Sequence, residues 1–124
     1  MKTECHLKYD EPTSNHLLNI LLCRCEEERV NLKRASILTI QALLLSINHP
    51  IECIDASVEK LRTKCRDLAL SIRKISAQAL TRLLLKMPNN ERLRTAWLHS
   101  VMNLVVDREP TVGTFCSKLI FVCF

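Results

Sequence analysis

The sequence predicts an all-α fold in which helical hairpins stack side by side as an α-solenoid. Leucine dominates the apolar residues, aromatic residues make up only 4% of the chain, and glycine occurs once, at position 113. This composition favours helices, because sandwiches, barrels and phosphate-cradling loops need more glycine for their tight turns. Apolar residues also recur at helical spacing, in a pattern that repeats along the chain. The 124 residues are enough for one domain with a modest core.

The chain aligns with itself at a shift of 40 residues, and such a period is the signature of a repeat architecture. The shift superimposes apolar positions, good helix N-caps, small residues and acids. The aligned sets include Leu32, Ile72 and Val112; Asn31, Ser71 and Thr111; Ser36, Ser76 and Cys116; and Glu27, Asp67 and Asp107. About three units fit in the chain, and paired helices at this period are typical of α-solenoids.

Each unit is expected to contain two helices. The predicted helices cover residues 14–27 and 31–47, then 52–66 and 71–87, then 91–106 followed by a weak segment from 111. Prolines fall between helices, where their missing N–H costs nothing, and Asn90 followed by Glu91 favours a helix start. The predicted organisation is a polar segment at 1–12 and a repeat array at 13–124, with units of about 13–50, 51–88 and 89–124, the last incomplete.

Residues 71–87 show the helical pattern most clearly. Their apolar face consists of Ile72, Ile75, Ala79, Leu80, Leu83, Leu84 and Met87. Such a stripe must be covered, so this helix is expected to pack on its partner and on the units at either side. The helix from Glu91 carries Trp97 on a similar stripe, which predicts a core residue rather than part of a ligand cage.

Basic residues are concentrated between positions 60 and 94. That stretch has ten Lys and Arg against two acids, a net charge of +8, whereas the whole chain carries +5. A surface of this sign can follow a phosphate backbone, and the scarcity of aromatic residues makes sequence-independent contact the expectation. The candidate nucleic-acid or chromatin contacts are Lys60, Arg62, Lys64, Arg66 and Lys74. An ordinary solvated helix face is the alternative.

The sequence predicts no catalytic centre, cofactor or metal site, and we expect no enzyme. One glycine cannot build a phosphate-binding loop, and His99 has no evident catalytic partner. Cys23 and Cys25, with Cys5 and His6, form the best metal candidate. Zinc sites usually have CxxC spacing on loops, whereas these two cysteines lie two residues apart near a helix end and face different directions. We therefore interpret them as structural.

The location of the chain is expected to be the cytosol or nucleus, with reduced thiols. Its seven cysteines are scattered, and the opening "MKTECHLKYDEP" is polar, with no signal peptide. The longest largely apolar stretch, residues 37–47, is too short to span a bilayer.

The segment "DLALSIRK" resembles the HEAT-repeat family, in which an acid precedes the second helix and a β-branched residue and an arginine open it. Asp67 and Arg73 match this pattern, and Glu27 and Lys33 match it conservatively. Asp107 matches too, but Gly113 stands where the base belongs. The resemblance implies an ARM-like, right-handed superhelix of about three HEAT-type hairpins. It also implies an inter-repeat ladder made by Glu27, Lys33, Asp67, Arg73 and Asp107.

Longer segments resemble the D-type non-SMC regulatory subunits of condensin II complexes. The segments are "ERVNLKRASILTIQALL", "CRDLALSIRKISAQALTRLLL" and "AWLHSVMNLVVDREPTV", within about residues 15–112. The resemblance implies a non-catalytic scaffold in mitotic chromosome condensation, on chromosomes in the nucleus. It implies SMC ATPases and a kleisin subunit as partners, with DNA or methylated histone tails as further contacts.

Two expectations qualify this resemblance. The ending "GTFCSKLIFVCF" departs from the family pattern, and the family's subunits are many times longer, so we expect this chain to be a fragment. The alternative function is a HEAT-type interaction module of a transport or phosphatase scaffold that binds peptides, because a fold does not fix a function.

Overall fold

The computed structural model describes residues 11–46 and 48–123, and this part of the chain forms six α-helices without strands. The helices are α2 (Glu11–Arg24), α3 (Val30–Ser46), α4 (Ile51–Lys64), α5 (Leu70–Lys86), α6 (Glu91–Leu104) and α7 (Pro110–Cys123). Their starts are spaced by 40 residues, both in α2, α4 and α6 and in α3, α5 and α7. The predicted all-α solenoid is therefore confirmed. Residues 1–10 of the predicted N-terminal segment lie outside the described residues.

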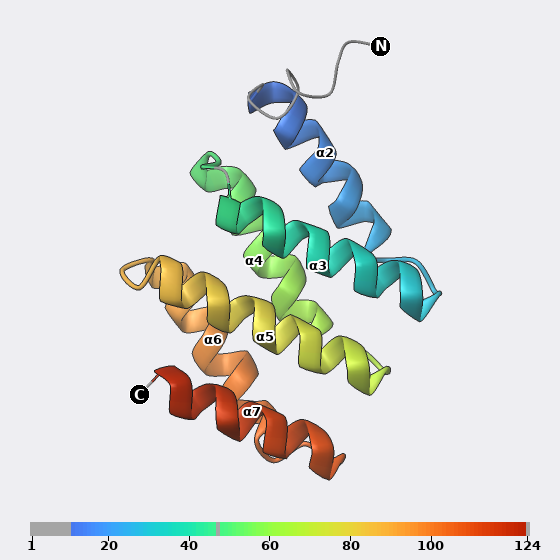
Figure 1. The fold of residues 1–124 in the computed structure, drawn as a ribbon, viewed down its shortest axis with the longest axis vertical. Helices are drawn as coiled ribbons and strands as arrows, with labels where there is room; N and C mark the ends of the chain where they lie inside the picture. The colour runs from blue at the N-terminus through green and yellow to red at the C-terminus, as the bar shows by residue number, and fades with distance from the viewer. Residues whose placement is uncertain (1–10, 47, 124) are drawn as a thin grey trace.

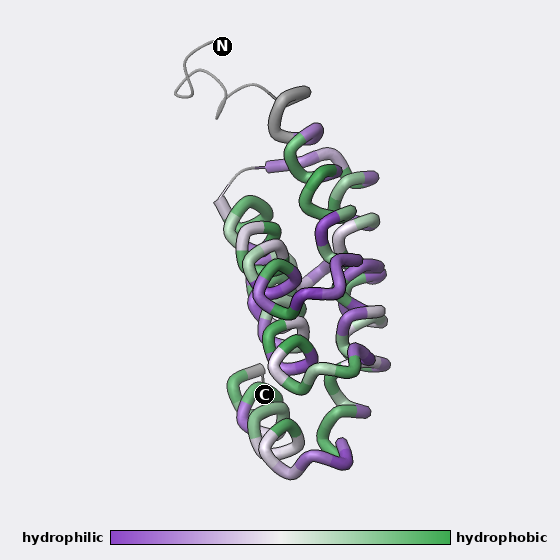
Figure 2. Tube along the Cα trace, turned by 90° about the vertical axis from the view of Figure 1, so that its right-hand side faces the viewer, coloured by the Kyte–Doolittle hydropathy of each residue, from purple (hydrophilic) through white to green (hydrophobic). Residues whose placement is uncertain are grey.

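The helices form two layers. The helices α3, α5 and α7 run in the same direction in the front layer of Figure 1, and α2, α4 and α6 form the layer behind them. Figure 2 shows these layers as two columns, with hydrophilic segments concentrated in the loops that join them. We call the hairpins unit one (α2–α3), unit two (α4–α5) and unit three (α6–α7). This arrangement buries one face of each helix between the layers and leaves the other to solvent.

The core runs through all three units and is centred on α5. On the predicted stripe of this helix, Ile72, Ile75, Ala79, Leu80 and Leu83 are buried, while Leu84 and Met87 are partly buried. The residues that pack around them come from the neighbouring helices on both sides. The middle unit therefore has the most complete packing.

Trp97 of α6 links unit three to unit two. Its side chain is only 1% exposed, which confirms the prediction that it belongs to the core. The indole Nε1–H donates to Thr81 Oγ1 at 2.9 Å, and the Thr81 hydroxyl donates to the Ala77 carbonyl at 2.8 Å. The polar end of this large side chain is thus satisfied at a junction between units.

The predicted caps are right at α6 and wrong at the second helix of each unit. Asn90 caps α6, because its side chain accepts the Leu93 N–H at 3.0 Å. Ser71 lies inside α5, and Asn31 and Thr111 are likewise inside α3 and α7. At α5 the N-cap is Ala69, no side chain caps the helix, and the Ala69 N–H donates to Asp67 Oδ2 at 3.0 Å. Asp side chains favour this turn two residues on, and they suit the positive end of a helix.

The segment from residue 111, predicted to be weak, is a complete helix of 14 residues. Pro110 opens it, a position where its missing N–H is not needed. Gly113 lies where a Cβ would sit 2.6 Å from the Val105 carbonyl oxygen. The glycine therefore allows the start of α7 to pack directly on the end of α6, and its place in the helix reflects this close contact.

Candidate interaction surface

Ion pairs join each unit to the next at the loop that follows the first helix of the later unit. Lys33 of α3 donates to both carboxylate oxygens of Asp67, with Nζ–O distances of 2.8 and 3.0 Å. Arg73 of α5 donates to Asp107 Oδ2 at 3.0 Å. All four side chains are at most 12% exposed, and in each pair the acid lies 34 residues after the base. The pairs therefore tie unit one to unit two, and unit two to unit three.

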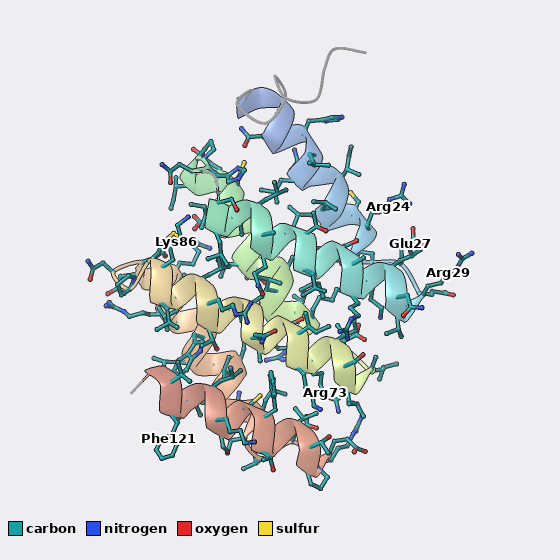
Figure 3. The ribbon with its side chains drawn as sticks, viewed as in Figure 1. Arg24, Glu27, Arg29, Arg73, Lys86 and Phe121 are labelled. Atoms are coloured by element: carbon teal, nitrogen blue, oxygen red, sulfur yellow. The ribbon has the colours of Figure 1, made fainter. Side chains whose placement is uncertain are left out.

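Arg73 makes the most extensive of these connections, between α5 and α7 in Figure 3. Its guanidinium also donates to the backbone carbonyls of Asp67, at 2.8 Å, and of Leu68, at 3.0 Å. Both terminal nitrogens of the guanidinium are therefore hydrogen-bonded, as a buried charge requires, while the buried Nε has no hydrogen-bond partner among the described residues. Within one unit, the acid and the arginine six residues apart meet through a backbone carbonyl and not through the carboxylate.

We call the set of contacts made between units by Lys33, Asp67, Arg73 and Asp107 the seam. Its two acids, Asp67 and Asp107, remain ionised despite their burial. Burial raises the pKa of Asp67, but hydrogen bonds from Lys33 and the Ala69 N–H outweigh it and hold the pKa below its ordinary value. Burial likewise raises the pKa of Asp107, but hydrogen bonds from the Glu109 N–H and from Arg73 outweigh it and hold the pKa below its ordinary value. The net lowering means that both carboxylates are more readily ionised in the folded chain than in the unfolded one.

Glu27 and Gly113 mark the two ends of this set of ion pairs. Glu27 pairs with Arg24 of its own unit at 3.4 Å, in an exposed position at the α2–α3 loop (Figure 3). Gly113 offers no base at the position that Lys33 and Arg73 hold in the earlier units. Lys86 adds a further contact between units, because its ammonium donates to carbonyls at the end of α3, those of Leu44 at 2.8 Å and Leu45 at 2.9 Å.

The predicted basic patch is mostly engaged in contacts within the protein. Lys60 and Lys64 both pair with Glu26, the second at 3.3 Å, and Arg62 pairs with Glu59. The hydrogen bond from Lys60 is the main reason that the pKa of Glu26 lies below its ordinary value. The remaining candidates are Lys74, whose ammonium lies 5.9 Å from the centre of the Phe115 ring, and Arg66, which is exposed and makes no ion pair with any described residue.

A second basic surface lies on the layer formed by α3, α5 and α7. The excess of Lys and Arg between positions 60 and 94 did not predict it as a separate surface. The helices α3, α5 and α7 contain no Asp or Glu. Their cations are Lys33, Arg34, Arg73, Lys74, Arg82, Lys86 and Lys118. The signal was present in the sequence, as the absence of acids from the second helix of every unit.

Four of these cations share one outward stripe, which we call the outer basic stripe: Arg34, Lys74, Arg82 and Lys118. Lys74 and Arg82 are eight residues apart on α5, and the 40-residue shift places Arg34 and Lys118 on the same side of α3 and α7. Arg34, Arg82 and Lys118 are exposed and form no ion pair in the part of the chain that the structure describes. Their charge is available to a partner.

Three of the five cysteines whose side chains the structure describes, Cys25, Cys65 and Cys116, are buried. Burial raises the pKa of Cys25 to about 11, of Cys65 to about 12 and of Cys116 to about 11. Cys23 is exposed while Cys25 is buried, so these two thiols face different directions. Residues 11–46 and 48–123 bring no three metal-binding side chains together, and Cys5 and His6 of the candidate site lie outside the described residues. Buried thiols with a high pKa are poor nucleophiles.

His99 is exposed on α6 and lines an open depression of about 480 Å³ between α4 and α6. Arg62, Arg92, Glu59 and Glu91 surround it, so the charges of the depression alternate in sign. None of the helices that the structure describes is long and apolar enough to cross a membrane.

These features define a class of protein: a helical-repeat stack, with polar contacts between its units and charged faces outside. The chain is similar to two condensin-2 D3 subunits, as the sequence predicted. It is 31% identical over 96 residues to condensin-2 complex subunit D3-L of Xenopus laevis, which aligns with 77% of this chain and 6% of the relative. It is 29% identical over 102 residues to condensin-2 complex subunit CAP-D3 of Arabidopsis thaliana, and this alignment covers 82% of this chain and 8% of the relative.

The chain thus spans less than a tenth of the length of these curated relatives. No family model matches the sequence. No solved structure matches the chain.

Proposed function

We propose that the chain is a non-catalytic scaffold segment of a condensin-like complex. The observation that carries this proposal is the similarity to two condensin-2 D3 subunits over about four fifths of the chain. The structure supports a scaffold role, because its buried polar contacts, such as those of Arg73 and Trp97, join one unit to the next. A stack of such units presents long surfaces to partners.

The proposed setting is mitotic chromosome condensation, on chromosomes in the nucleus. In a condensin-like complex the partners would be SMC ATPases and a kleisin subunit, and ATP hydrolysis would belong to the SMC proteins. The described helices offer continuous faces, which suits a supporting role in such a complex.

We further propose that the outer basic stripe contacts chromatin. Arg34, Arg82 and Lys118 present positive charge on a layer without acidic residues, and such a face attracts a phosphate backbone. The contact is expected to be independent of base sequence, because its cations bind the phosphate backbone and aromatic residues make up only 4% of the chain. The same stripe offers less to methylated histone tails, which are themselves cationic and which aromatic cages recognise.

Affinity purification of the tagged chain from mitotic cell extract, read by mass spectrometry, tests the proposed membership of a complex. Recovery of SMC ATPases together with a kleisin subunit is the expected result. A matched bait with Arg73→Glu controls for specificity, because a charge reversal at the seam disrupts the stacking that would present the binding faces. Recovery of transport or phosphatase partners instead would contradict the proposal and favour the alternative scaffold function.

A further inference from the structure

The outer face of unit three carries an apolar groove between α6 and α7. Its volume is about 600 Å³, and Lys118 is the charged residue among those that line it. Phe121 and Val106 stand at the groove with 87% and 83% of their surface exposed. Phe121 points away from α5, toward the outside of the stack (Figure 3). Large apolar side chains exposed this far, around a hollow, are typical of a binding surface.

The groove is the repeat equivalent of a junction that is closed inside the molecule. A shift of 40 residues places Ile120 on Leu80 and Phe121 on Thr81. Leu80 and Thr81 are buried, and Thr81 accepts the indole hydrogen bond of Trp97 from unit three. The groove is therefore the face on which a further unit would stack in the same register.

The opposite outer face, on α2, is apolar at the matching positions. Leu17 and Ile20 are 42% and 41% exposed there. A shift of 80 residues places Leu17 on Trp97, and a shift of 40 places Ile20 on Lys60. Both equivalent residues contact the preceding unit, because Trp97 donates a hydrogen bond to Thr81 and Lys60 forms an ion pair with Glu26.

If a second copy of the chain stacks on the groove in the same register, the equivalent positions meet across the junction between the two copies. Leu17 of one copy would meet Phe121 of the other, as Trp97 meets Thr81. Ile20 would meet Val106, because Val106 is the equivalent of Glu26. The hydrogen bond between Trp97 and Thr81 and the ion pair between Lys60 and Glu26 are thus each replaced, at the junction between copies, by a contact between two apolar side chains.

The seam charges fit this junction as well. The base that would pair across it is replaced by Gly113, and the acid that would receive it, Glu27, is already paired with Arg24 in its own unit. Stacking therefore leaves no seam charge buried without a partner, which would otherwise oppose association.

We propose that copies of this chain associate head to tail, with α2–α3 of one copy on the α6–α7 groove of the next. Such a heterologous contact does not close on itself, so it produces open chains of increasing length. Each chain carries a net charge of +5, which opposes association. Added salt screens this repulsion and leaves the apolar contact intact, so salt should promote assembly.

Light scattering coupled to size-exclusion chromatography tests the proposal on the full chain. The mass should rise from the monomer value of 14.3 kDa through multiples of it as concentration increases. Phe121→Glu blocks the groove and Ile20→Glu blocks the opposite face, so each variant alone should remain monomeric. Leu68→Glu, at a residue that is 89% exposed and outside both faces, is the matched control and should assemble as the unaltered chain does.

A mixture of the two blocked variants is the decisive sample. Phe121→Glu retains the α2 face and Ile20→Glu retains the groove, so together they should form a 1:1 dimer of twice the monomer mass and nothing larger. Circular dichroism of each variant checks that it is folded. A monomer at every concentration of the unaltered chain would overturn the proposal. Assembly that Phe121→Glu abolishes but Ile20→Glu leaves intact would also overturn it, because that result indicates a two-fold contact between grooves.

Discussion

At the scale of single residues, Arg73 is the side chain on which the seam depends most. It is 6% exposed, and it binds Asp107 and two backbone carbonyls at once. Removing one partner of a buried ion pair leaves the other charge uncompensated, at a cost of about 3–5 kcal/mol. We expect Arg73→Leu to lower the free energy of unfolding by about this amount in urea denaturation. The double variant with Asp107→Leu should recover part of the loss, and additive losses would show that the two side chains are not coupled.

The seam acids also predict how stability depends on pH. The pKa values of Asp67 and Asp107 are lower in the folded chain than the ordinary value of about 3.9 expected after unfolding. The unfolded chain therefore binds protons more readily, and the stabilisation is fully present above about pH 4 and lost as the pH falls through the folded values. Urea unfolding from pH 7 to pH 3 should show this loss. Asp67→Asn with Asp107→Asn should flatten the curve, and an unchanged curve would contradict the assignment.

The sequence predicted the residue types of the seam but not the way in which they pair. Asp67, Arg73, Lys33 and Asp107 stand out from the HEAT resemblance alone. Their partners lie 34 residues away, across a junction whose geometry depends on how the units stack. Glu27 belongs to the same pattern, yet it has no base on an earlier unit among the described residues and pairs locally with Arg24.

At the scale of helices, the helix propensity of residue 113 and its packing against α6 favour different residues. Alanine is normally favoured over glycine within a helix by about 0.5–1 kcal/mol. At position 113 the added Cβ would lie 2.6 Å from a backbone oxygen, which cannot move away without shifting α6 or α7. We expect Gly113→Ala to lower the melting temperature measured by circular dichroism, whereas Thr114→Ala, at the exposed next position of α7, should leave it unchanged or raise it. A stabilising Gly113→Ala would contradict the close contact.

The helix count and pairing were predictable, because apolar spacing and the 40-residue period are local properties of the chain. The helix starts were less so. Ser71 looks like a good cap, but α5 begins at Leu70 with Ala69 as its N-cap, and the Ala69 N–H donates to Asp67. Asp67 also binds Lys33 of the preceding unit. The residues before α5 are thus held by a contact between units, which local helix preferences do not include.

At the scale of the whole molecule, charge is sorted between the two layers. The stretch from 60 to 94 includes parts of both layers, among them the end of α4 and all of α5, so its net charge sums residues that lie on two different surfaces. Lys60, Arg62 and Lys64 belong to the layer that also carries the acids, and the structure pairs them with Glu26 and Glu59. The free cations Arg34, Arg82 and Lys118 lie on the other layer, where α3, α5 and α7 run side by side and contain no acid (Figure 1).

The most direct test of this account is the salt dependence of binding to a fluorescent DNA duplex. The variant Arg34→Glu, Arg82→Glu, Lys118→Glu reverses the outer basic stripe. The matched control Arg29→Glu, Arg66→Glu, Arg108→Glu changes the net charge equally but lies in the loops at one edge. The account predicts that the stripe variant binds more weakly and that its slope of log K against log salt becomes shallower by about 0.9 for each lost phosphate contact. Equal losses in both variants, or an unchanged slope in the stripe variant, would contradict it.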